Sequence, residues 1–425
     1  DELEDGLVAN SSVRNQRSTS DENQKRTLFQ LDYILPIDDN TQFELGYRGN
    51  FSRQETDYRV EDLIDNVYVN NTSFTNYLVF EQNVNAAYTQ FGKKINNFSY
   101  LAGLRVEKTN ITIEQQTTQE TSNKNYTDWF PTLNLSYEFN EKENITLGYS
   151  RRIRRPRSYL INPFRSISSL TFFFQGNVDI DPSYTNSIDF GYLKRWDNFT
   201  FNGSVYFQKS TQNFSRITEA TDEYVNLESG EYFSDPSLTN SPTVQVLQST
   251  FINLAENRRT GTEFTLTYSP KRDVRISGNF NVFNSETIGD YNGDSLDASI
   301  VSWFARINAS FPLPFDITTQ IRGFYRGPTE NAITKTEGRF TLTGALNKNI
   351  LNKKATISFR ASDILNSSRS ISRTTRDTFT SYNEYQWRNP TYILTLTYRI
   401  NERKLDRKRR RSNNESGGDG GDYEF

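Results

Sequence analysis

Apolar and polar side chains alternate with a period of two along most of this chain. In Phe29–Leu35 every second residue is apolar or aromatic, and Gln30 and Asp32 lie between them. Phe199–Phe207 repeats the pattern, with Phe199 and Phe207 in the same phase. A period of two places alternate side chains on opposite faces of a β-strand. The pattern therefore predicts an all-β protein.

The alternation predicts about fifteen antiparallel strands. Their expected ranges are 27–36, 42–54, 77–91, 97–114, 126–139, 144–154, 185–195, 198–214, 250–269, 274–286, 299–311, 317–328, 336–347, 355–366 and 384–400. Many of these strands exceed ten residues. Strands of soluble sheets average about five or six residues, which disfavours the alternative of a β-sandwich.

The connections between these strands alternate between short and long. The short ones lie at 36–41, 92–97, 140–144, 195–198, 270–273, 312–316 and 347–354. The long ones lie at 55–76, 115–125, 155–184, 215–249, 287–298, 329–335 and 367–383. Short turns at one end and long loops at the other are typical of an antiparallel up-and-down transmembrane β-barrel, in which the short turns face the periplasm.

Composition agrees with a barrel. Only 34% of the residues are hydrophobic and the mean hydropathy is −0.75, yet 14% are aromatic. No run of about 18 apolar residues is present, so the sequence predicts no membrane-spanning helix. A barrel needs apolar residues only at alternate positions, with aromatic residues at both membrane interfaces. We expect Phe201, Val205, Phe264, Leu266, Leu342 and Leu396 to face lipid.

The residue types that are absent exclude several functions. The chain has no Cys and no His, which removes Ser-His-Asp and Cys-His catalysis and the usual zinc ligands. The formal net charge of −3 shows no bias towards nucleic acid. We therefore predict neither an enzyme nor a cofactor or metal site. The stretch Gly289–Asp297 is rich in Asp, but it lacks the full calcium-loop pattern and is interpreted as a hairpin turn.

The strand count bears on domain organisation. Bacterial single-chain barrels have an even number of strands, so fifteen strands suggest the C-terminal part of a barrel of about 22. The chain begins with Asp1, so we expect a processed or trimmed product. We expect a polar lead-in at 1–24, the barrel at 25–400, and a disordered periplasmic tail at 401–425. The wall should then be open, or completed by a partner chain.

Several segments resemble the TonB-dependent receptors, a family of outer-membrane transporters. They are Asp128–Tyr137, the Arg-rich stretch Tyr149–Pro156, Asn162–Phe164, Gln175–Asn177 and Ser362–Asn366. The resemblance implies a barrel in the outer membrane of a diderm bacterium, in contact with lipid and lipopolysaccharide. It also implies uptake of a large or scarce ligand, such as a metal chelate, a glycan or a peptide, through a plugged lumen.

The resemblance implies a plug domain and TonB as partners, if the full chain carries the segments that they require. No such segment is recognisable in these 425 residues. The alternative is a structural or assembly component of an outer-membrane protein complex, without transport activity. A stable partner protein and no small ligand would favour that alternative.

The candidate site residues lie in and after the Arg-rich stretch. If Ile145, Leu147 and Tyr149 face lipid, then Arg152 and Arg154 face the lumen. There they would hold a plug or an anionic ligand, or else form a salt-bridge network within the wall. In the motifs that follow, the further lumen, plug or ligand candidates are Asn162, Gly176 and Asn177. The long loops 155–184 and 215–249 are expected to capture ligand from outside.

Overall fold

The computed structural model describes residues 15–400, except 73, 118, 228, 292–293, 296, 331–333 and 376–379. The predictions for residues 1–14 and for the tail at 401–425 lie outside the described residues. So do positions 292, 293 and 296 of the Asp-rich turn.

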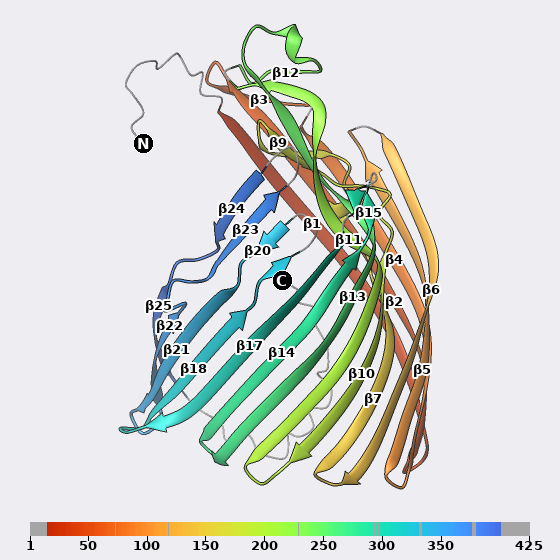
Figure 1. Cartoon of the computed structure of the whole chain (residues 1–425), viewed down its shortest axis with the longest axis vertical. Helices are drawn as coiled ribbons and strands as arrows, with labels where there is room; N and C mark the ends of the chain where they lie inside the picture. Colours follow the sequence, from red (N-terminus) through yellow and green to blue (C-terminus); the bar gives the residue numbers. More distant parts are fainter. Residues whose placement is uncertain are drawn as a thin grey trace.

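Fifteen long strands form one antiparallel meander, each paired with the next along the chain (Figure 1). The strands are β1 (Gln16–Asp38), β2 (Thr41–Ile64), β4 (Asn76–Ile95), β5 (Phe98–Gln115), β6 (Glu120–Asn140), β7 (Glu143–Arg154), β10 (Ser183–Arg195), β11 (Phe199–Asn226), β13 (Thr243–Lys271), β14 (Val274–Ile288), β17 (Ala298–Leu313), β18 (Ile317–Arg326), β21 (Arg339–Ile350), β22 (Ala355–Ser362) and β25 (Thr391–Tyr398). All fifteen predicted strands are therefore present. The sheet curls into a wall with the short turns at one end.

Short elements decorate the opposite, long-loop end of the wall (Figure 1). They are β3 (Val67–Asn70), α1 (Ser158–Ile161), β8 (Arg165–Ser169), β9 (Phe172–Gln175), β12 (Tyr232–Phe233), η1 (Pro236–Leu238), β15 (Asp290–Tyr291), β16 (Asp294–Ser295), β19 (Thr329–Glu330), β20 (Thr334–Thr336), β23 (Arg369–Thr375) and β24 (Thr380–Gln386). No helix in the described part of the chain is long and apolar enough to cross a membrane.

Several strands extend beyond their predicted ends. The expected loop 215–249 is mostly a two-stranded arm, because β11 continues to Asn226 and β13 begins at Thr243. The expected loop 367–383 is a hairpin of β23 and β24, so the predicted strand 384–400 begins too early. β1 likewise starts at Gln16, within the predicted lead-in. The extension of β1 at 16–26 carries no apolar side chain, and the arm buries isolated ones such as Val225 and Val246, which pack with Phe173. Neither shows the sustained alternation that predicts a strand.

The two faces of the wall differ as predicted. Register partners share a face, and Phe201 pairs with Leu266 while Phe190 pairs with Val205. Val205 is 56% exposed and Leu266 is 41% exposed, on the convex side of the wall. The pairing registers of the following strands place Phe264, Leu342 and Leu396 on this same outer face. Exposed apolar side chains over a whole face need an apolar surrounding, which a lipid bilayer supplies.

The first and last strands of the meander are open edges. Among the described residues, β1 pairs only with β2, and β25 pairs only with β22. Every residue of both strands is exposed. The wall is therefore open in this structure, as the strand count predicted.

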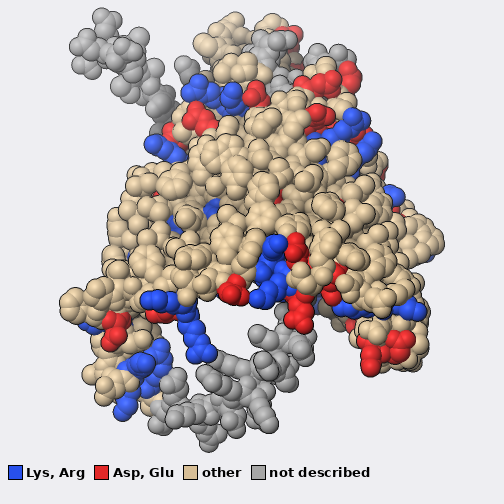
Figure 2. Space-filling model, turned by 60° about the horizontal axis from the view of Figure 1, so that its bottom comes forward, with Lys and Arg blue, Asp and Glu red and all other residues tan. Residues whose placement is uncertain are grey.

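The rim at the short-turn end carries alternating charges. Figure 2 shows basic and acidic side chains side by side at this end, whereas most of the visible wall above it carries none. Lys94 pairs with Glu138 at 2.6 Å, and Lys194 pairs with Glu143 at 3.2 Å. In a transmembrane β-barrel, the end of the wall lies at the level of water and lipid headgroups, where charged side chains are solvated.

Candidate functional site

The segment 155–184 folds inward across the mouth of the wall. Its side chains Leu160, Ile161 and Ile180 are buried in a cluster with residues of the inner wall face. Those wall residues are Leu78 and Phe80 of β4 and Ile111 and Ile113 of β5. Apolar side chains on an otherwise polar inner face thus have a packing partner, and the segment is held at the mouth as a packed element.

Asn162, Gly176 and Asn177 hold this segment in shape. Gly176 N donates to Asn162 O at 2.8 Å, and Asn177 N donates to Leu160 O at 2.8 Å. A Cβ at Gly176 would lie 2.6 Å from Asn162 O, so only glycine fits here. Asn177 Nδ2 also donates to Phe251 O of β13 at 3.2 Å. Each of these three residues therefore helps to shape the segment. That they contact a plug or a ligand stays a prediction.

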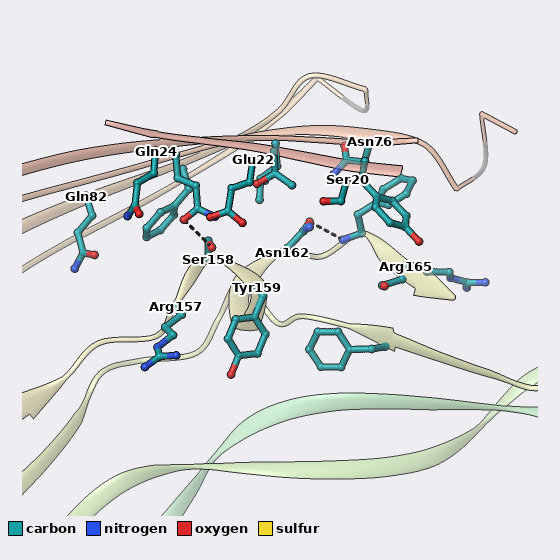
Figure 3. Close-up of a pocket in the computed structure, with 18 of the residues that line it drawn as sticks. Ser20, Glu22, Gln24, Asn76, Gln82, Arg157, Ser158, Tyr159, Asn162 and Arg165 are labelled. Atoms are coloured by element: carbon teal, nitrogen blue, oxygen red, sulfur yellow. Dashed lines mark hydrogen bonds between the residues drawn. The ribbon is translucent and has the colours of Figure 1, made fainter. Parts of the chain in front are cut away.

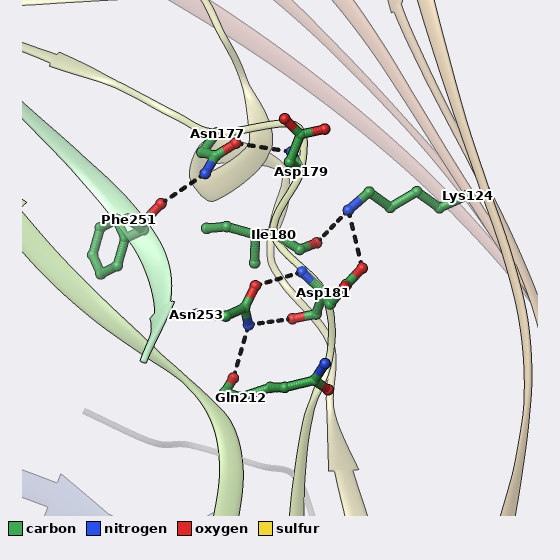
Figure 4. Close-up of polar contacts among 8 residues, drawn as sticks. All are labelled: Lys124, Asn177, Asp179, Ile180, Asp181, Gln212, Phe251 and Asn253. Atoms are coloured by element: carbon green, nitrogen blue, oxygen red, sulfur yellow. Dashed lines mark hydrogen bonds and ion pairs between the residues drawn. The ribbon is translucent and has the colours of Figure 1, made fainter. Parts of the chain in front are cut away.

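A polar network fixes the other end of the segment (Figure 4). Lys124 Nζ of β6 donates to Ile180 O at 2.6 Å and lies 3.4 Å from Asp181 Oδ1. Asn253 of β13 accepts from Asp181 N at 2.7 Å and donates to Asp181 O at 2.8 Å. Its amide also donates to Gln212 O of β11 at 2.8 Å. Two strands of the wall, β6 and β13, therefore hold residues 180 and 181 in a defined geometry, and β11 in turn holds Asn253.

Arg152 and Arg154 lie on the inner face, as the alternation predicted. Arg152 pairs in register with Thr185, and both arginines are exposed. Neither forms an ion pair with any residue in the described ranges, and Arg154 packs over the ring of Phe214 at 5.3 Å. The salt-bridge network that was the alternative prediction for these two arginines is formed by their neighbour Arg155 instead, whose guanidinium donates to Glu107.

The inner wall and the segment 155–184 enclose a pocket of about 640 Å³ at the long-loop end (Figure 3). The strands β1, β2 and β4 supply their inward, even-numbered positions to it. Those residues are Ser20, Glu22, Gln24, Ser52, Gln54, Thr56, Tyr58, Asn76, Leu78, Phe80 and Gln82. The segment supplies Arg157, Ser158, Tyr159, Asn162, Phe164, Arg165, Ser166 and Phe174. Of the predicted site residues, only Asn162 lines this pocket.

Amides, hydroxyls and aromatic rings dominate the pocket. Ser158 Oγ donates to Gln54 Oε1 at 3.1 Å, which links the segment to β2. Arg165 is paired with Glu223 through two hydrogen bonds, at 2.7 and 3.0 Å. Asn76 is 2% exposed, and neither its Nδ2 nor its Oδ1 has a hydrogen-bond partner among the described residues. A buried amide without a partner is rare, because it carries its full desolvation penalty.

Sequence reasoning missed this pocket because no motif marks it. Its wall side follows from the alternation of β1, β2 and β4, which could have placed Gln54 and Asn76 on the inner face. Its other side depends on segment 155–184 folding inward, and no local sequence pattern predicts this inward fold. Within the described part of the chain, no cluster of three acidic residues is arranged to hold a metal ion.

A long antiparallel meander with an apolar outer face, a polar inner face and a segment folded into its mouth defines the wall of an outer-membrane β-barrel. The chain matches the outer membrane protein beta-barrel family over residues 3–398, and it belongs to that family. A search of curated proteins gave no match.

Solved structures of outer-membrane transporters share the fold. The ferric yersiniabactin uptake receptor FyuA from Yersinia pestis is 11% identical, with a TM-score of 0.59 over 90% of this chain and 55% of that one. The copper transporter OprC is 14% identical, with a TM-score of 0.57 over 82% and 51%. The ferric citrate transporter FecA is 12% identical, with a TM-score of 0.55 over 92% and 56%. The chain thus spans about half the length of these proteins.

Proposed function

We propose that this chain forms most of the barrel wall of an outer-membrane transporter of the TonB-dependent type. It would take up a large or scarce ligand, such as a metal chelate, a glycan or a peptide. The observation that carries the proposal is the segment 155–184, which folds across the mouth and leaves a pocket against the inner wall. A packed element at the mouth is better suited to a protein that captures a specific ligand than to an open pore for free diffusion.

The proposed orientation places the short turns in the periplasm and the pocket on the cell surface. The outer face contacts lipid, and the long-loop end meets lipopolysaccharide. Arg152 and Arg154 face the lumen without an acidic partner among the described residues, which suits contact with a plug domain or an anionic ligand. Energised uptake would further need the plug and TonB.

The open edges at β1 and β25 bear on partners. Unpaired backbone groups in lipid cost several kcal/mol each, so a stable wall needs further strands at both edges. We propose that these strands close the barrel, either from the same polypeptide or from a partner chain. If a partner chain supplies these strands, the same open edges also support the alternative function, a structural component of an outer-membrane complex.

Single cysteines test the orientation, because the chain has no native Cys. Ser234→Cys lies in the segment between β11 and β13, and Asp273→Cys lies in the short turn between β13 and β14. A membrane-impermeant maleimide should label position 234 in intact cells and position 273 only after the outer membrane is opened. The Cys-free protein is the control. The reverse labelling would contradict the proposed orientation.

Uptake separates the two functions. Cells with and without the gene would be compared for accumulation of radiolabelled ferric citrate, a neutral hexasaccharide and a neutral hexapeptide. A transporter predicts loss of one of the three, with rescue by the intact gene. Unchanged accumulation of all three would favour the structural role.

A further inference from the structure

The pocket beside segment 155–184 carries information about the chemistry of its ligand. Its lining is close to neutral, with Glu22 and Arg157 as its charges besides Arg165, which Glu223 neutralises. A site that selects an anionic chelate would place unpaired cations around it. Here the wall side instead presents hydroxyls and the amides of Gln24, Gln54 and Gln82, all from inward positions.

Asn76 is the second observation. It lies on the wall side of the pocket, in register with Tyr58 of β2 (Figure 3). Its side chain is 2% exposed, and both amide atoms lack a partner in the structure. An amide offers one acceptor and a donor group at one place, which matches a hydroxyl that both donates and accepts. A buried group of this kind gains a hydrogen bond only when something enters the pocket.

Two aromatic residues of the mouth segment, Tyr159 and Phe174, also line the pocket. Tyr159 is 53% exposed, and its ring centroid lies 6.4 Å from that of Phe174. The two rings add apolar surface to a lining that otherwise consists largely of hydrogen-bonding groups. The cavity of about 640 Å³ falls within the range of small-ligand sites, about 300–1,000 Å³. A ligand with one apolar face and a rim of hydroxyl groups matches both surfaces, and a sugar ring has this form.

We propose that the pocket binds a neutral oligosaccharide, with Asn76 hydrogen-bonding one of its hydroxyls and Tyr159 packing against a sugar ring. This inference rests on the proposed transporter function and names its substrate class. An anionic metal chelate would find little positive charge in this near-neutral lining to hold it.

The test measures binding to the full-length protein purified in detergent. The probes are neutral hexasaccharides of glucose, xylose and mannose, with ferric citrate and a neutral hexapeptide as alternatives. Titration calorimetry should detect at least one hexasaccharide and neither alternative. Asn76→Leu should weaken its binding at least tenfold, and Tyr159→Ala should weaken it as well. Gln320→Leu, an exposed inner-face amide on β18, is the matched control and should bind like the wild type.

Thermal stability separates ligand recognition from a structural role. Since the Asn76 amide has no partner in the structure, Asn76→Leu should leave the melting temperature unchanged or raise it. A lowered melting temperature together with unchanged saccharide affinity would overturn the proposal. Binding of ferric citrate or of the peptide alone would overturn the substrate class and leave the transporter function standing. Absence of binding to every hexasaccharide would also overturn it.

Discussion

Arg155, the residue that follows β7, donates its guanidinium to the buried carboxylate of Glu107 on the inner face of β5. The same group donates to Thr109 Oγ1 at 2.9 Å. Arg105 donates to Glu107 from the same strand. The start of the mouth segment is therefore tied to the inner wall by a charged contact, and the position of the pocket depends on it.

Replacing Arg155 with Gln should destabilise the mouth. A hydrogen bond to a charged group contributes about 1.5–3 kcal/mol, and among the described residues Glu107 would keep only Arg105 as a charged partner. The melting temperature of the folded barrel, followed by its heat-dependent mobility on a gel, should fall. Arg152→Gln is the matched control, since Arg152 is exposed and has no ion pair among the described residues; it should melt like the wild type. Equal melting of both variants would contradict the structural role of Arg155.

Gly176→Ala should loosen the mouth segment. The added Cβ would lie 2.6 Å from Asn162 O and 2.7 Å from Leu160 O, and both are backbone atoms that cannot step aside. Hydrogen exchange of the amides in 158–177 should speed up. Gly278→Ala offers the control, because a Cβ there meets nothing within 4 Å. Unchanged exchange in Gly176→Ala would show that the close approach to α1 is not needed.

Leu266→Arg should impair assembly, whereas Thr265→Arg should be tolerated. Both lie on β13, but Leu266 is on the outer face and Thr265 points inward, where Asn279 donates to it at 2.9 Å. An arginine facing lipid near the midplane costs about 2–4 kcal/mol, and one in a wet lumen costs far less. The fraction of folded protein in outer membranes measures the difference. Equal loss in both variants would remove the distinction between the two faces.

The hairpin of β23 and β24 should respond to acid. Hydrogen bonds from Arg369 and Tyr382 lower the pKa of Glu384 below its ordinary value of 4.5. Stability from this contact is therefore present above the unfolded pKa and is lost as the pH falls through the lowered folded pKa. Amide exchange in 369–386, corrected for its intrinsic pH dependence, should rise below pH 4.5. Glu384→Gln should exchange faster at neutral pH and lose this acid response. An identical response in the variant would assign it to other groups.

The extent to which the sequence predicts this fold follows from where an apolar face is required. Within the wall, outward positions such as Phe264 and Leu266 alternate with polar residues, so every long strand and the inner placement of Arg152 could be predicted. Beyond the wall, the arm of β11 and β13 buries isolated apolar side chains such as Val225 and Val246, which pack with Phe173. There the continuation of β11 to Asn226 leaves no periodic signal, and the arm was predicted as a loop.

The candidate site was harder to predict for a different reason. Asn162 and Gly176 were singled out from a family motif, and their contacts prove to shape the mouth segment. Asn76 belongs to no motif. Its significance depends on its burial beneath a segment about 80 residues away in the chain, and on the absence of a partner for its amide in the structure. Local sequence patterns carry neither fact.

The central claim is that one face of this sheet meets lipid and the other meets water. Nitroxide labels on single cysteines at 264 to 268 of β13 test it in reconstituted bilayers. Positions 264, 266 and 268 should be more accessible to oxygen, which concentrates in lipid, and positions 265 and 267 to a water-soluble nickel complex. Such a two-residue period is the predicted result. Equal accessibility at all five positions, or the opposite phase, would contradict a transmembrane barrel wall.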